Sequence, residues 1–135
     1  MPVLSLPLPT PPPCAATSPA PYFLLRRTPG APTLLHLILL DAHGQLGHWV
    51  MALPLYQLRR PPRRLLLVQA GPMPLDALEE VEEGEVRFEA QRPAACRRRV
   101  AEGQLRLTFL GQQLRGRFQL SRSAADATTW WLCAL

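Results

Sequence analysis

The sequence contains no lysine and no asparagine, and its only isoleucine is Ile38. These absences are typical of a genome that avoids AT-rich codons, so the use of arginine alone for positive charge says little about function. Arginine nevertheless remains permanently charged, and its forked donor groups suit phosphate. The chain has 15 basic and 10 acidic residues, which gives a formal charge of +5. A partner with negative charge is therefore compatible with its composition.

Cysteine is scarce, and the longest apolar run is short. Cys14, Cys96 and Cys133 are an odd and widely spaced set, which fits neither a disulfide framework nor a zinc site. Cys133 is expected to be a small core residue. The run from Leu34 to Leu40 is too short to span a bilayer, and prolines interrupt the apolar start of the chain. We therefore expect a soluble cytoplasmic protein with no membrane partner.

Proline is abundant but unevenly placed, since half of the 16 prolines fall within residues 1–21. This segment has almost no charge, and its composition is typical of an extended or disordered tail. Its Pro11–Pro13 run could instead bind an aromatic groove as a polyproline helix. The remaining chain, residues 22–135, has the length of one compact domain.

Most of residues 22–135 show the patterns of short strands. Strands are predicted at Tyr22–Arg26 and Leu65–Val68, and the segments Leu34–Leu40 and Gln45–Leu53 are separated by turn residues, which indicates a hairpin. In the second strand of that hairpin, Trp49 and Met51 share one face. The leucine spacing in 75–83 predicts a short helix.

The last third of the chain shows the clearest alternation. Apolar residues alternate with polar and basic ones in Gln104–Leu110 and again in Leu114–Leu120, which predicts a hairpin with one apolar and one basic face. Trp130–Leu135 is expected to be the final strand. The sequence thus predicts a mainly β fold, a small closed or partly open β-barrel with one or two short helices.

Several motifs in this order resemble one family. The segment from Gly103 to Arg122, followed by Trp130-Trp131-Leu132, resembles the C-terminal strands of the 3′-phosphoesterase domain of bacterial DNA ligase D. Residues 41–50 resemble its "E-L-D-G-x-L-K-S-W-A" hairpin, Arg64-Leu65 its "K-R-L-A" and residues 74–76 its "H-P-L-D-Y". The resemblance covers residues 22–135 and implies a β-barrel that acts on DNA ends, with Mn²⁺ as cofactor if the domain is active.

The departures from the family fall on its metal site. The family has an upstream histidine, an "H-Y-D-x-R" cluster and the histidine and tyrosine of "H-P-L-D-Y". A gapless match on Trp49 places Leu35, His36, Leu37 and Leu39 at the cluster. A shift of one residue places His36 on the histidine but Ile38 on the aspartate. The upstream histidine falls near Pro29, and Met73 and Ala77 replace the last two residues. Leucine, isoleucine and proline side chains have no lone pair for a hard cation, so we expect a domain without this metal site.

Histidines and glutamates supply the remaining candidates for chemistry. His36, His43 and His48 are the only imidazoles. Together with Arg64, they are the participants we name if the chain is catalytic. A site formed by His43, His48 and Asp41 across the hairpin could hold a metal or a phosphate, although surface histidines explain the pattern more simply. The glutamates between 79 and 85 could form a carboxylate site, but such a charge run is more often a solvated face.

The arginines carry the stronger signal. If the fold brings them together, they form a basic surface that follows a nucleic-acid backbone; the alternative is solubilising surface charge. Three functions follow: a non-catalytic phosphoesterase-like barrel that binds DNA or assists a DNA ligase or primase-polymerase, a divergent metal-dependent 3′-phosphoesterase, and a protein-interaction module. The candidate phosphate-binding residues are Arg59, Arg60, Arg63, Arg64, Arg97, Arg98, Arg99, Arg106, Arg115, Arg117 and Arg122.

Overall fold

A computed structural model describes residues 20–58, 64–89 and 93–135, and for 93–96 only the course of the backbone. Its strands are β1 (Tyr22–Thr28), β2 (Ala31–Asp41), β3 (Gly44–Ala52), β4 (Arg64–Gln69), β5 (Glu79–Phe88), β6 (Gln104–Leu110), β7 (Arg115–Arg122) and β8 (Thr129–Ala134). Two 3-10 turns, η1 (Leu55–Leu58) and η2 (Leu75–Ala77), and one helix, α2 (Pro93–Glu102), complete the described elements. The domain predicted for residues 22–135 thus contains every described element, and the predicted tail lies largely outside the described residues.

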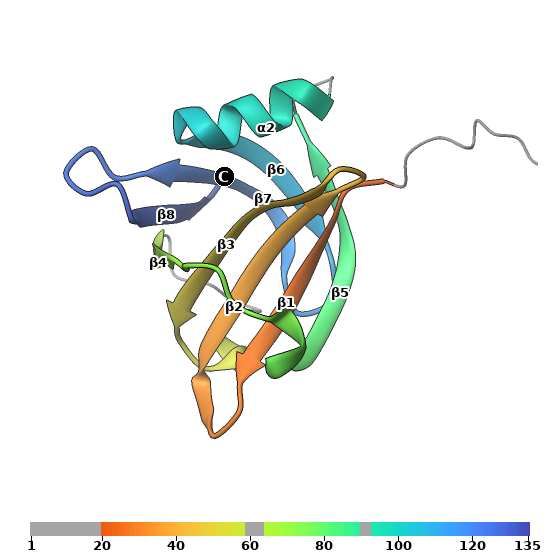
Figure 1. Cartoon of the computed structure of the whole chain (residues 1–135), viewed down its shortest axis with the longest axis vertical. Coiled ribbons are helices and arrows are strands. Elements are labelled where there is room, and N and C mark those ends of the chain that lie inside the picture. The colour runs from red at the N-terminus through yellow and green to blue at the C-terminus, as the bar shows by residue number, and fades with distance from the viewer. Residues whose placement is uncertain (1–19, 59–63, 90–92) are drawn as a thin grey trace, which may run out of the picture.

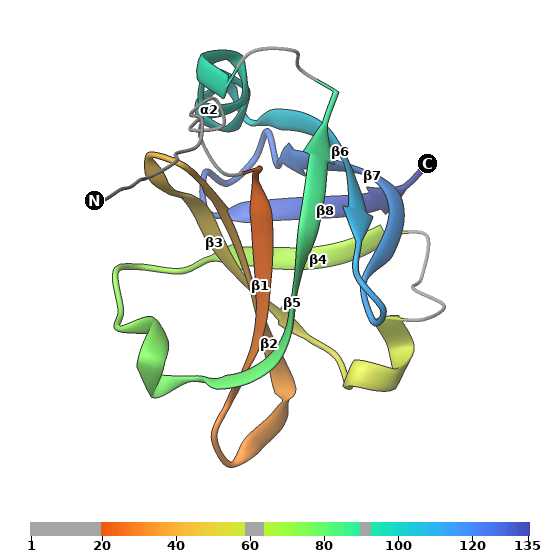
Figure 2. The same ribbon diagram turned by 90° about the vertical axis from the view of Figure 1, so that its right-hand side faces the viewer.

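The strands form a closed antiparallel barrel in the order β1-β2-β3-β4-β8-β7-β6-β5 (Figures 1 and 2). The barrel closes where β1 pairs with β5 from Tyr22↔Glu85 to Arg27↔Glu79. The predicted hairpins β2–β3 and β6–β7 are both present. The expectation of a mainly β fold with a small barrel is confirmed. No helix in the described part of the chain is long and apolar enough to cross a membrane.

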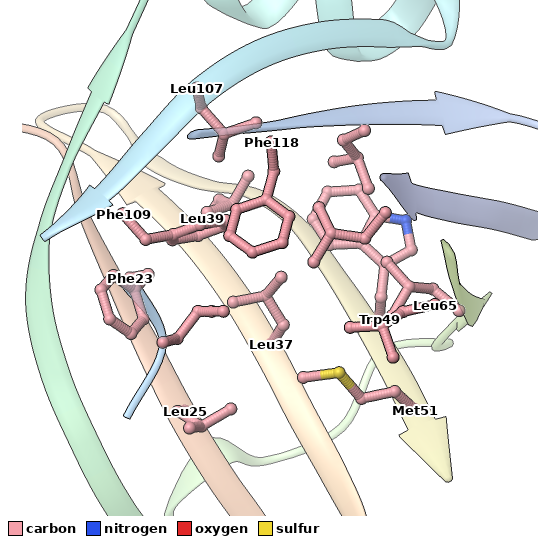
Figure 3. Packing of buried hydrophobic residues seen from close by; sticks show 14 of the residues in the cluster. Phe23, Leu25, Leu37, Leu39, Trp49, Met51, Leu65, Leu107, Phe109 and Phe118 are labelled. Carbon is pink, nitrogen blue, oxygen red and sulfur yellow. The ribbon is translucent and has the colours of Figure 1, made fainter. Parts of the chain in front are cut away.

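Alternation along each strand places one set of side chains inside the barrel. Figure 3 shows Phe23, Leu37, Trp49, Phe109 and Phe118 pointing into this interior from different strands. Edge-to-face pairs join the rings, with centroids 5.2 Å apart for Phe23 and Phe109, an arrangement that aromatic quadrupoles favour. The interior is therefore a packed apolar core rather than a channel.

The connection between β4 and β5, residues 70–78, runs along the outside of the barrel and carries η2 (Figures 1 and 2). Its first residue, Ala70, donates a backbone hydrogen bond to the carbonyl of His48. Arg26 donates from its guanidinium to the carbonyl of Leu75 at 2.9 Å. Leu78, at the end of this connecting segment, is buried. The segment therefore packs against the outer face of β1 to β3.

Sequence predictions for residues 75–83 and for Cys133 are wrong. The helix expected over 75–83 is a single 3-10 turn followed by β5, because Glu79 to Glu85 pair with β1 and close the barrel. Leu78, which helical spacing would place on a helix face, has an extended backbone, and its side chain is buried. Cys133 is not a core residue: its neighbours Trp130 and Leu132 point inward on β8, and Cys133 lies on the outer, partly exposed side.

Candidate functional site

The outer face of β6 and β7 carries Arg106, Arg115 and Arg117. Their neighbours Leu107 and Phe118 are buried in the core, so alternation turns these arginines outward. Arg106 and Arg117 lie on adjacent strands, at Arg106↔Gln119 and Thr108↔Arg117 in the register. All three are exposed. The basic face that the sequence predicted for this hairpin is thus present for these three residues.

Some of this positive charge is neutralised locally. Arg117 donates from Nε to Glu89 Oε1 at 2.7 Å, and Arg87 forms an ion pair with Glu85. Arg106 donates to the amide oxygen of Gln119 at 3.1 Å, and Arg115 donates to a backbone carbonyl. Among the described residues, neither Arg106 nor Arg115 has an acidic partner. Both guanidiniums therefore keep their full charge and further donors for an anion.

Arg64 lies on the same outer surface. Arg64 lies in one row with Arg106 across β4, β8, β7 and β6. The row follows from the register, which pairs Arg64↔Cys133, Cys133↔Gln119 and Gln119↔Arg106. Three strand spacings separate the two backbones by about 14 Å. The guanidinium of Arg64 lies 3.9 Å from the ring centroid of Trp131, a cation–π contact that restricts its position.

Sequence reasoning missed the role of Trp131 in this surface. Trp130 and Trp131 are adjacent, so one of them must point inward and the other outward in a strand. Trp130 is in the core at 5.3 Å from the ring of Trp49, and Trp131 is half-buried on the outer face. The two adjacent tryptophans already indicate that one ring lies on the outer face, but the sequence does not show which of the two it is.

Among the remaining candidate arginines that the structure describes, Arg97 is bound elsewhere and Arg99 approaches this surface. Arg97 on α2 bonds Asp41 at 3.2 Å and the carbonyl of Gln45, and so ties the helix to the β2–β3 hairpin. Arg98 is exposed, and Arg99 borders a pocket with Arg106. Arg59, Arg60 and Arg63 lie outside the described residues.

Arg122 differs most from its expected position. It was expected on the polar face of the C-terminal hairpin, but it has the inward parity of Phe118 and Leu120 at the end of β7. Its guanidinium lies 5.7 Å from the Trp130 ring centroid and donates to the carbonyl of Ala101. Arg122 therefore joins the end of α2 to the end of the barrel, away from the outer face of β6 and β7.

His36 and His48 form a buried pair outside the core. Their strands place Leu37 and Trp49 inward, so both imidazoles face outward, yet they are only 5% and 4% exposed. His36 Nδ1 and His48 Nε2 lie 2.8 Å apart, and Thr28 Oγ1 lies 2.8 Å from His36 Nε2. Ile38, on the same face, is fully buried. The connecting segment 70–78 begins beside this pair, where Ala70 donates a backbone hydrogen bond to the carbonyl of His48.

The pair favours neutral rings. A single ring proton satisfies the contact between the two nitrogens, whereas protonation of both rings would place two donors face to face. Burial lowers the pKa of His36. Burial, together with the charge that His36 would carry, lowers the pKa of His48 to about 4. At neutral pH both rings are therefore uncharged hydrogen-bonding groups.

His43 is not part of this pair. It is exposed in the β2–β3 turn, where its backbone N–H donates to Asp41 Oδ1. The site imagined from His43, His48 and Asp41 is therefore not assembled, because His48 turns toward His36 and Asp41 binds Arg97. In the part of the chain that the structure describes, no group of three or more His, Cys, Asp or Glu residues could hold a metal ion.

The acidic run has two different roles in β5. Glu79 and Glu85 are partly exposed and form ion pairs with Arg27 and Arg87, as expected for a solvated face. Glu82 instead accepts backbone hydrogen bonds from the β6–β7 turn, including one from Leu114 at 3.1 Å. Local sequence patterns do not predict this contact, because Gln113 in the turn is 31 residues away from Glu82 along the chain.

Neither the models of known protein families nor the curated proteins match the chain.

Proposed function

We propose that this chain is a non-catalytic, phosphoesterase-like β-barrel that binds DNA through backbone phosphates. The observation that carries the proposal is the outer surface of Arg64, Arg106, Arg115 and Arg117, in which the charges of Arg106 and Arg115 have no acidic partner among the described residues. Guanidinium groups on a strand face contact phosphate oxygens without reading base sequence. Such contacts suit a protein that holds DNA or its ends for a DNA ligase or a primase-polymerase.

The position of Ile38 supports the absence of catalysis. With the one-residue shift in the family resemblance, His36 takes the place of the family's histidine and Ile38 that of its aspartate. Both lie on the outer face of β2. Arg26, which is paired with His36 in the register, donates to the carbonyl of Leu75 in the "H-P-L-D-Y" match. Ile38 is fully buried. A buried apolar side chain thus stands where the resemblance would require a carboxylate ligand for Mn²⁺.

Salt-dependent binding to oligonucleotides tests the DNA-binding part of the proposal. Binding of single- and double-stranded oligonucleotides should weaken linearly on a log–log scale as salt rises, with a slope of about −0.9 for each phosphate contact to the duplex. The triple variant R106Q/R115Q/R117Q should bind more weakly and show a shallower slope. R27Q, which removes one charge from β1 outside the candidate surface, is the control. The single variant R106Q, which also removes one charge, should lose more affinity than R27Q. Equal loss in R27Q and R106Q would contradict the proposed surface.

An assay for 3′-phosphate removal tests the absence of catalysis. The purified protein with Mn²⁺ should leave 3′-phosphate and 3′-ribonucleotide ends intact. Removal of a 3′-phosphate that depends on Mn²⁺ and is abolished in His36→Ala would overturn this part and favour the divergent enzyme. Binding that is absent or insensitive to salt would instead favour the protein-interaction module.

A further inference from the structure

A polar pocket lies between α2 and the adjoining ends of β5 and β6. It has a volume of about 420 Å³ and is lined by Glu89, Arg99, Gln104, Leu105 and Arg106. Figures 1 and 2 show α2 lying next to β6 at one end of the barrel. Pockets that bind small ligands start at about 300 Å³, so this one has room for a phosphate and part of a nucleotide.

Two arginines line this pocket. Arg106 reaches it from β6, with its Nε directed to Gln119 Oε1. Arg99 reaches it from α2, and within the described residues no hydrogen bond or ion pair holds its guanidinium. Both side chains are exposed. The helix and the strand therefore place two full positive charges at one concave site, a geometry that favours an anion.

The one carboxylate in the lining does not cancel this charge. The carboxylate of Glu89 accepts a hydrogen bond from Arg117 Nε and forms an ion pair with the Arg117 guanidinium. Arg117 thus offsets Glu89, and Arg99 and Arg106 remain as the net charge at the pocket. Gln104 adds an amide that can donate to a further oxygen.

We propose that this pocket binds a phosphomonoester, and in the context of the proposed DNA binding the phosphate at a DNA end. A terminal phosphate carries close to two negative charges near neutral pH, which matches two guanidiniums. An internal phosphodiester carries one charge and has a nucleoside on each side, so it enters a concave pocket less readily. The DNA source of the phosphate rests on the proposed function; the affinity for a phosphomonoester does not.

The test compares oligonucleotides that differ only at their ends. Duplex and single strands with a 5′-phosphate, a 3′-phosphate or hydroxyl ends are titrated at fixed salt by fluorescence anisotropy, and inorganic phosphate and a nucleoside monophosphate serve as competitors. We expect roughly tenfold tighter binding of at least one phosphorylated end. R99Q and R106Q should remove this preference. R98Q makes the same substitution at the neighbouring exposed residue of α2 and should keep it.

The possible outcomes separate the two proposals. If DNA binds but the phosphorylated ends show no advantage, or if R98Q and R99Q lose it equally, the pocket proposal is wrong and the proposed function stands. If DNA does not bind, but inorganic phosphate or the monophosphate raises the Tm of the wild type and not that of R99Q, the pocket binds a free phosphomonoester and the DNA proposal fails. Thermal unfolding of each variant shows whether the fold is retained.

Discussion

The buried pair of His36 and His48 makes the stability of the protein depend on pH. The pKa of His48 is lowered in the folded state to about 4, from the ordinary value of 6.5 that applies to the unfolded chain. Between these values the unfolded chain binds a proton at this position that the folded chain does not bind. The free energy of unfolding therefore falls as the pH falls below 6.5, and this loss is complete below about pH 4.

The size of the effect follows from the lowered pKa. Each pH unit within this window changes the free energy of unfolding by about 1.4 kcal/mol for one group. Between pH 6.5 and pH 5.0, His48 alone should therefore reduce stability by about 2 kcal/mol. The lowered pKa of His36 acts in the same direction.

Urea unfolding at pH 7.5 and pH 5.0 measures this effect. The wild-type protein should lose at least about 2 kcal/mol between the two conditions beyond the loss in His48→Gln, whose side chain does not titrate. His43→Gln, at the exposed turn, should keep the wild-type dependence. Should His48→Gln show the same loss as the wild type, the reasoning about the buried pair is refuted.

Two further substitutions test the packing of the barrel. A Cβ on Gly47 would lie 2.2 Å from the Trp49 ring, and Trp49 is buried in the core, so Gly47→Ala should destabilise by about 1–3 kcal/mol in thermal unfolding; an unchanged Tm would contradict this packing. Glu82→Gln should cost about 1–3 kcal/mol, because Glu82 accepts several backbone N–H groups of the β6–β7 turn, whereas Glu79→Gln, at an exposed ion pair, should cost less than about 1 kcal/mol.

Local patterns were sufficient for most of the strands. The alternation of Leu105, Leu107 and Phe109 with polar residues identified β6, and turn residues at 41–44 located the β2–β3 hairpin. The same local reading failed at 75–83, where leucine spacing suggested a helix but pairing with β1 imposed a strand. Barrel closure depends on residues far apart in the sequence, and local spacing does not contain it.

The candidate site was only partly predictable for the same reason. Outward positions for Arg106, Arg115 and Arg117 follow from alternation within one hairpin. Arg99 lines the same pocket as Arg106 because it lies on α2. The sequence analysis did not predict this helix. The pairing of His36 with His48 depends on the register of β2 and β3, which brings together two residues that are 12 positions apart in the sequence.

The most direct test of the central claim is the affinity of the protein for a DNA duplex as a function of salt, measured for the wild type and for R106Q/R115Q/R117Q. We expect a steep negative salt slope for the wild type and a slope shallower by about two to three in the triple variant. Identical slopes for the two proteins, or no binding by the wild type at low salt, would contradict the claim that this face binds DNA phosphates.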